Sequence, residues 1–174
     1  EKVTETEALE YYRTLLEHAG ERPASVGLNS KLVKEDGQLK EYVWKAGGMY
    51  DKAIVEVMYW LKKAMEEAPP EQKEIIGTLI SFYSSGDLAL FDHYNILWVK
   101  ETSQPVDFIN GFIETYNDPL GFKGTWESVV HILDAEATER TRILAAHAQW
   151  FEDHSPVDER FKKETVTGIS ARTV

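Results

Sequence analysis

The chain has 174 residues, 43% of them hydrophobic, and its 30 acidic and 19 basic residues give a formal net charge of -11. This length suits one folded domain with a sizeable core, and no run of about 18 apolar residues is present that could span a membrane. The acidic charge and the lack of a Lys/Arg cluster argue against a nucleic-acid partner and favour cationic ligands such as peptide amino termini. The absence of cysteine excludes disulfides and thiolate metal sites.

The N-terminal part of the chain predicts a helix followed by a β-hairpin. Thr4 and Glu7 fit a capping box for a helix over residues 4–19. Residues 27–48 read as two strands joined by Asp36-Gly37, which supplies the two positive-φ residues of a type I′ turn.

The middle of the chain predicts three consecutive helices. The first covers residues 49–68, Pro69-Pro70 ends it and starts the second, and Gly86 closes the second helix before Asp87 caps the third. Apolar residues recur at helical spacing in the first of them: Ile54, Val57, Met58, Leu61 and Met65. The short connections predict antiparallel neighbours.

After Pro105 the period changes from helix to strand, and the alternation starting at Asp107 predicts a strand that ends in a Gly/Pro-rich turn. Asp134 is expected to cap a last helix that reaches about Asp153, and a final strand is expected after Pro156. The predicted fold class is α+β, mainly helical, with a β-hairpin and a few further strands.

The predicted strand places an acid and a phenol on one face, because residues two apart point the same way. Phe112, Glu114 and Tyr116 share that spacing. A carboxylate on a rigid element can bind an ammonium group, and a phenol can donate a hydrogen bond to a developing oxyanion. The alternative interpretation is a half-exposed strand face without a function.

Other candidate chemistry has weaker support. The five histidines show no His-Glu-x-x-His spacing, so we interpret each as solvated or satisfied within the fold. Several carboxylates could pair for acid/base hydrolysis, although their spacing supports no pair: Glu114, Asp118, Glu127 and Asp134. The aromatic residues Tyr59, Trp60 and Trp98 are interpreted as core residues.

Three stretches together resemble the dipeptidyl peptidase III family, whose members are zinc metallopeptidases that remove dipeptides from the amino termini of short peptides. The stretches are residues 27–54, 91–130 and 148–164. The most specific block is GFIETYNDPLG at residues 111–121, where an acid and a tyrosine two apart precede an Asp-Pro turn.

The resemblance implies a two-lobed peptidase with a cleft that closes on peptide. It implies that Glu114 binds the ammonium group of the substrate and that Tyr116 hydrogen-bonds the scissile carbonyl. Within the single fragment 1–174, it implies that residues 1–130 belong mostly to the non-zinc lobe, built of a β-core and helices. Residues 131–155 would form a helix of the zinc-bearing lobe, and residues 156–174 would return to the β-core.

The zinc motif of the family, His-Glu-x-x-x-His with a later glutamate, does not occur in this chain. We therefore expect a piece of a longer polypeptide, upstream of the zinc site, that binds no zinc itself and is inactive alone. Its start at Glu1 without an initiator Met agrees with this expectation. The expected partners are a short peptide and the rest of the polypeptide, and the family implies a cytoplasmic location.

Two alternatives to a peptidase segment stay open. One is a stand-alone peptide-binding or interaction module without catalysis, which the absence of a downstream zinc motif would favour. The other is a self-contained carboxylate-dependent hydrolase, which would resist EDTA.

Overall fold

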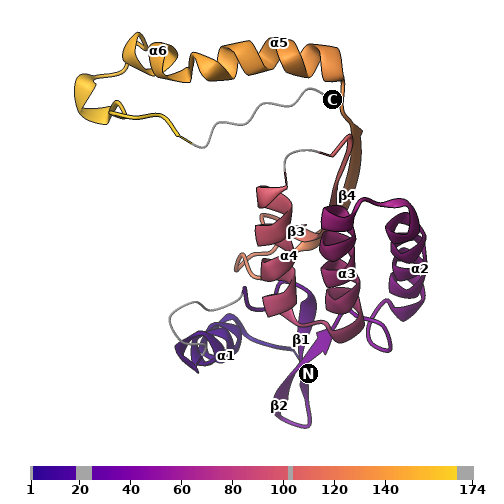
Figure 1. The fold of residues 1–174 in the computed structure, drawn as a ribbon. Coiled ribbons are helices and arrows are strands. Elements are labelled where there is room, and N and C mark those ends of the chain that lie inside the picture. The colour runs from indigo at the N-terminus through magenta and orange to yellow at the C-terminus, as the bar shows by residue number, and fades with distance from the viewer. Residues whose placement is uncertain (1, 19–24, 102–103, 168–174) are drawn as a thin grey trace. The chain divides into compact units, whose positions relative to one another are not determined.

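The computed structural model describes residues 2–18, 25–101 and 104–167 of a chain that divides into two compact units. Unit 1 comprises Glu1–Glu101 and Asn110–Ser128, and unit 2 comprises Thr102–Ile109 and Val129–Val174. Within the described ranges, no helix combines the length and the apolar character needed to cross a membrane. The elements confirm the predicted α+β class with mainly helical content (Figure 1).

Unit 1 begins with the predicted helix and hairpin. Helix α1 (Glu5–His18) starts at a capping box in which Thr4 N donates to Glu7 Oε2 over 2.9 Å and Glu7 N donates to Thr4 Oγ1 over 3.3 Å. Strands β1 (Ser30–Glu35) and β2 (Gln38–Val43) pair antiparallel, and their last pair flanks the turn. Asp36 (φ 49°) and Gly37 (φ 78°) supply the two left-handed residues, which confirms the predicted turn.

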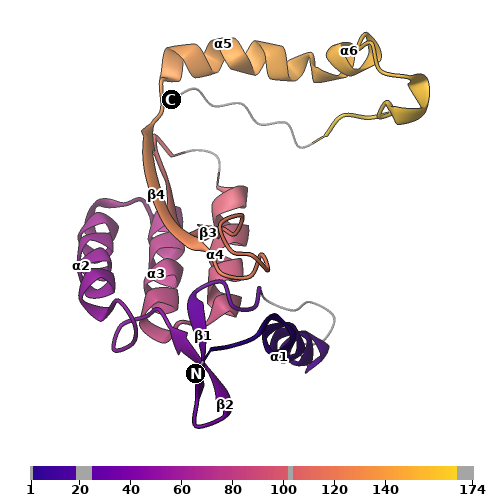
Figure 2. The same ribbon diagram turned by 180° about the vertical axis from the view of Figure 1, so that it is seen from behind.

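Three helices follow in unit 1: α2 (Asp51–Glu67), α3 (Pro70–Ser85) and α4 (Leu88–Lys100). Helix α3 packs against both α2 and α4 and lies between them (Figures 1 and 2). Gly86 ends α3 in the left-handed conformation, with its N–H bonded to Phe82 O, and Asp87 Oδ1 accepts from Ala89 N to cap α4. The predicted helix ends are thus confirmed.

The core of unit 1 is centred on α3. Its most deeply buried side chains are Ile76, Leu79, Phe82 and Tyr83, and burial stabilises each large apolar side chain by roughly 1.5–3 kcal/mol. The interpretation of the α2 aromatic residues as core was wrong, because Tyr59 is 51% and Trp60 is 66% exposed. Ile54 occupies the buried face of α2, and residues five and six positions later point elsewhere.

Strand β3 (Val106–Glu114) pairs with β4 (Thr125–Ile132). The sequence predicted β3 after Pro105 but extended it through Tyr116, which was wrong. Asp118 N donates to Thr115 O over 2.9 Å, and this turn ends the strand at Glu114. Strand β4 was not predicted at all.

Unit 2 contains α5 (Ala135–Ala146), α6 (Ala148–Asp153) and the 3-10 helix η1 (Glu159–Phe161). Asp134 caps α5 as predicted, with its carboxylate accepting from Ala137 N over 2.8 Å. The single helix predicted as far as Asp153 is interrupted at His147, whose φ and ψ of -102° and 15° leave the helical region.

The strand expected after Pro156 does not form in the described residues 157–167, and residues 168–174 lie outside the described ranges. Side chains of α6 bind the backbone of this segment instead. Glu152 Oε1 accepts from Lys163 N over 2.7 Å, and Gln149 Oε1 accepts from Val166 N over 2.8 Å. These N–H groups are therefore not available to a strand partner.

Candidate active site

Glu114 is the last residue of β3 and is half-buried. Its backbone oxygen accepts a hydrogen bond from Thr125 Oγ1 over 3.2 Å, which ties the end of β3 to the start of β4. Two residues earlier, Phe112 is 4% exposed and its ring centroid lies 4.8 Å from that of Trp44. The backbone of Glu114 is therefore fixed in two ways, by the hydrogen bond to its own carbonyl oxygen and by the packing of Phe112 two residues earlier.

The Glu114 carboxylate makes no hydrogen bond or ion pair with any residue that the structure describes. Two other half-buried carboxylates of unit 1 differ from it in this respect. Glu41 accepts from Ser30 Oγ over 2.6 Å, and Glu7 accepts from Lys34 Nζ over 2.6 Å. A half-buried carboxylate without a cationic or donor partner is suited to bind an ammonium group from a ligand.

Tyr116 lies in the turn after β3 rather than on the strand. Its side chain is 76% exposed, and within the described parts of the chain its hydroxyl has no hydrogen-bond partner. The structure therefore places Glu114 at the end of β3 and Tyr116 in the turn that follows it. It does not give them the shared strand face that was predicted from their spacing.

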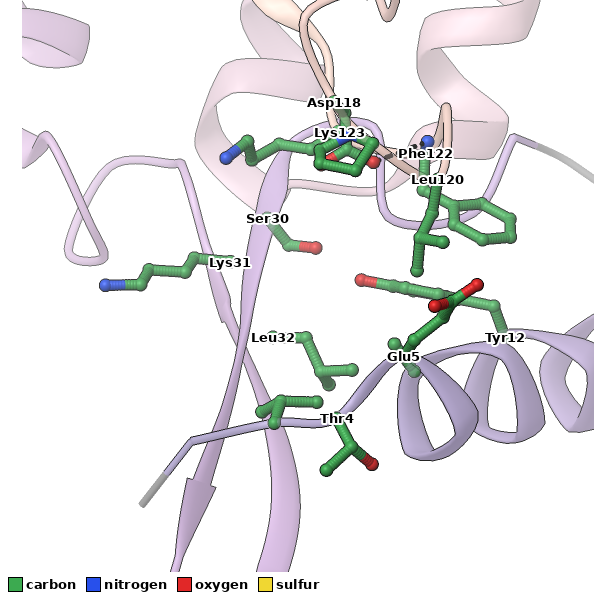
Figure 3. Close-up of a pocket in the computed structure, with 13 residues that line it drawn as sticks. Thr4, Glu5, Tyr12, Ser30, Lys31, Leu32, Asp118, Leu120, Phe122 and Lys123 are labelled. Atoms are coloured by element: carbon green, nitrogen blue, oxygen red, sulfur yellow. Dashed lines mark hydrogen bonds between the residues drawn. The ribbon is translucent and has the colours of Figure 1, made fainter.

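Two cavities lie in unit 1 beside this turn. The first, of about 510 Å³, lies between α1, β1 and the loop that follows Tyr116 (Figure 3). In that view Tyr12, Ser30, Leu32 and Leu120 point toward one another. The second, of about 500 Å³, is lined mainly by aromatic and aliphatic side chains, among them Trp44, Tyr50, Phe112 and Trp126. Glu114 and Tyr116 line neither cavity.

The remaining carboxylate candidates do not pair for acid/base chemistry. The Asp118 carboxylate accepts from Phe122 N, the Asp134 carboxylate accepts from Ala137 N, and Glu127 Oε1 accepts from Thr125 Oγ1 over 3.3 Å. Each of these carboxylates thus has a local structural partner.

The described residues contain no group of three or more His, Asp or Glu side chains that could hold a metal ion. The Nδ1 atoms of three histidines instead contact the backbone oxygen four residues earlier in the chain: His18, His147 and His154. The residues that the structure describes do not fit a zinc site.

Sequence reasoning missed the residues that support the site. The Thr125 hydroxyl donates a hydrogen bond to the Glu114 carbonyl oxygen, and Thr125 is positioned to do so by strand β4, which was not predicted. Asp118 was placed in an Asp-Pro turn and considered as a possible acid, but the bond that its carboxylate accepts from Phe122 N was not predicted.

Comparisons with known proteins agree with the predicted resemblance. A family model described as Peptidase family M49 matches residues 2–168. The dipeptidyl peptidase 3 of Dictyostelium discoideum is 31% identical over 118 residues, which cover 67% of this chain and 17% of that protein. The dipeptidyl peptidase 3 of Homo sapiens is 24% identical over 134 residues, which cover 73% of this chain and 18% of that protein.

A solved structure has the same fold. The structure of DPP III from Caldithrix abyssi superposes with a TM-score of 0.68 at 18% identity, and the match covers 90% of this chain and 29% of that one. This chain therefore spans less than a fifth of the length of the curated relatives it matches. Because the family model covers nearly all of its residues, the chain belongs to peptidase family M49, the dipeptidyl peptidase III family.

Proposed function

We propose that this chain is the substrate-positioning part of a zinc-dependent dipeptidyl peptidase that removes dipeptides from the amino terminus of short peptides. The observation that carries the proposal is the pair of unpartnered groups at the end of β3. The Glu114 carboxylate and the Tyr116 hydroxyl have no hydrogen-bond partner in the described chain, and they lie two residues apart on an anchored backbone.

Glu114 is the group that selects a free amino terminus. An α-amino group has a pKa of about 7.7–8.0 and is mostly charged at neutral pH, so it pairs with a carboxylate through charge-assisted hydrogen bonds. A cut two residues from the amino terminus requires such a fixed point at one end of the substrate. The net charge of -11 also attracts a cationic end.

Tyr116 is the group that acts on the scissile carbonyl. Its hydroxyl donates to the carbonyl oxygen and binds it more strongly as negative charge develops there. Hydrogen bonds to a developing oxyanion lower the barrier because they strengthen in the transition state. Neither residue supplies the nucleophile.

Zinc belongs, in this proposal, to the rest of the longer polypeptide. The described residues do not fit a zinc site, so the residues that hold the metal are expected elsewhere in that polypeptide. In the proposed division, residues 1–130 are mostly the non-zinc lobe, residues 131–155 belong to the zinc-bearing lobe, and residues 156–174 return to the β-core.

Exposed apolar side chains in unit 2 support the proposed contact with the rest of the polypeptide. These side chains are each about half exposed or more: Ile143, Leu144, Trp150, Phe151 and Phe161. Large apolar side chains exposed in such number are typical of surfaces that pack against another part of a protein. The proposed location is the cytoplasm, which fractionation of cells that produce the full-length enzyme would test.

The test uses the full-length enzyme, a peptide with a free amino terminus and the same peptide acetylated there. We expect the parent to release dipeptides only from the free peptide. Glu114→Gln should lower kcat/KM by about 10-fold to 150-fold, the effect of losing a hydrogen bond to a charged group. Glu74→Gln, which makes the same change at an exposed glutamate of α3, is the matched control.

Equal rates on the free and the acetylated peptide would contradict the role of Glu114. Peptide binding without any release of dipeptides would favour the stand-alone binding module instead.

A further inference from the structure

The loop that carries Tyr116 consists of two consecutive turns that meet at Asp118. In the first, Asp118 N donates to Thr115 O over 2.9 Å; in the second, Gly121 N donates to Asp118 O over 3.0 Å. Gly121 has φ of 71°, a left-handed value that glycine adopts without strain. Asp118 is thus the residue through which the Tyr116 turn joins the rest of the loop.

The far end of the loop is anchored on unit 1. The Phe122 ring centroid lies 4.5 Å from that of Tyr12 in α1, with the rings 32° apart. Gly124 N donates to Leu28 O over 2.8 Å, and a Cβ at Gly124 would lie 2.9 Å from Leu28 Cδ1. The backbone around residues 122–124 therefore has little freedom to move.

The Asp118 side chain connects these two parts. Its Oδ2 accepts a hydrogen bond from Phe122 N over 3.0 Å, and the side chain is half-buried. Figure 3 shows Asp118 and Phe122 at the same end of the first cavity, with Tyr12 next to the Phe122 ring. Because Phe122 is fixed on unit 1, this hydrogen bond also restrains the turn that contains Tyr116.

The position of Tyr116 depends on its backbone, which lies between the anchored end of β3 and this turn. Its side chain is 76% exposed, and no hydrogen bond to a described residue holds its hydroxyl. An oxyanion donor must lie about 2.7–3.1 Å from the oxygen it stabilises, and a displacement of about 1 Å can lower a rate by 10²-fold. For Tyr116 to act as an oxyanion donor, the backbone of its turn must therefore be rigid.

We propose that Asp118 is a positioning residue for Tyr116, which it holds in place by fixing the turn through Phe122 N. The proposal rests on the proposed role of Tyr116 as the oxyanion donor. Asp118 itself does not touch the substrate, and its carboxylate acts as a backbone acceptor. An asparagine at this position keeps a side-chain oxygen that can accept the same bond, whereas an alanine removes it.

The experiment compares single and double variants of the full-length enzyme by steady-state kinetics. Asp118→Ala should lower kcat by about 10-fold to 100-fold with KM changed by less than about threefold, because binding of the amino terminus by Glu114 is retained. Asp118→Asn should stay within about threefold of the parent in kcat. Tyr116→Phe combined with Asp118→Ala should be no slower than Tyr116→Phe alone, since the displaced hydroxyl is already absent.

Asp87→Ala is the matched control, because the Asp87 carboxylate also accepts one backbone N–H, from Ala89, at the start of α4. It should lower thermal stability as Asp118→Ala does while leaving kcat unchanged. This comparison separates loss of stability from loss of position.

Different outcomes overturn different claims. Losses in kcat that multiply in the double variant would overturn the role of Asp118 while leaving that of Tyr116 intact. An Asp118→Asn enzyme as slow as Asp118→Ala would also overturn the role of Asp118. Parental kcat in Tyr116→Phe would overturn the proposed role of Tyr116, and the role of Asp118 with it.

Discussion

Trp126 Nε1 donates a hydrogen bond over 2.9 Å to the hydroxyl of Tyr83, a fully buried residue of α3. The same hydroxyl donates to Asn110 Oδ1, and Asn110 Nδ2 donates to Ser128 Oγ over 3.2 Å. Residues of β3 and β4 are thereby joined through one phenol to the core helix of unit 1. Burial raises the pKa of the Tyr83 hydroxyl, which therefore stays protonated and able to donate.

Tyr83→Phe should destabilise the protein by about 1–3 kcal/mol, because it leaves Asn110 Oδ1 and Trp126 Nε1 without their partner while keeping the buried ring. Denaturant unfolding of parent and variant measures the difference. Tyr59→Phe removes the hydroxyl from an exposed tyrosine of α2 and is the control, with an expected change within about 0.5 kcal/mol. A Tyr83→Phe protein as stable as the control would contradict a structural role for this network.

Tyr116→Phe in the full-length enzyme should lower kcat by about 10²-fold to 10³-fold, the effect of removing one oxyanion donor, and change KM little. Tyr116 is 76% exposed and its hydroxyl has no described partner, so the thermal stability should not change. Kinetics and a thermal melt on the same preparation test both expectations. A large rise in KM at unchanged kcat would instead assign Tyr116 to substrate binding.

The sequence predicted those elements whose ends carry a local signal. Asp36-Gly37, Gly86 and Asp134 each act within a few residues of their own position, and the structure confirms the turn, the helix end and the cap that they predict. A capping side chain that accepts a bond from a nearby N–H group, or a glycine that adopts a left-handed conformation, acts in the same way in almost any tertiary context. Such features are therefore readable from one sequence.

The errors occurred where distant contacts decide the structure. Strand β4 follows a predicted turn but forms by pairing with β3, which the sequence analysis did not foresee. Tyr59 and Trp60 are aromatic residues that α2 leaves on its exposed face. In the candidate site, the choice of Glu114 and Tyr116 came from spacing and from resemblance. The support that Thr125 gives to Glu114 spans eleven residues and could be found only in three dimensions.

The 174-residue chain alone should release no dipeptides, with or without added zinc. Its described residues contain no group of three metal-ligating side chains, and Glu114 and Tyr116 supply neither a metal ion nor a nucleophile. A peptide-release assay on the purified chain, before and after EDTA treatment, tests this expectation. Activity that survives EDTA would support the carboxylate-dependent hydrolase, and activity that appears with zinc would show a metal site within the chain.

The ion pair between Glu7 of α1 and Lys34 of β1 makes the stability of unit 1 dependent on pH. Lys34 Nζ donates to Glu7 Oε1 over 2.6 Å, and this bond, together with those from Thr4, lowers the pKa of Glu7 from 4.5 to about 2. In the folded protein Glu7 therefore binds a proton less readily than in the unfolded chain. Its contribution to stability is complete above about pH 4.5 and is lost as the pH falls toward 2.

Glu7→Gln removes this contribution at neutral pH, because the neutral amide keeps the shape of the side chain without its charge. The difference in melting temperature between parent and Glu7→Gln should be largest above pH 4.5, shrink between pH 4.5 and 2, and vanish below that window. Glu74→Gln, which changes an exposed α3 glutamate with no ion pair to a described residue, is the matched control for altering a helix glutamate. A Glu7→Gln difference that is constant from pH 7 to pH 2 would mean that the Lys34 pair does not link α1 to β1 in solution.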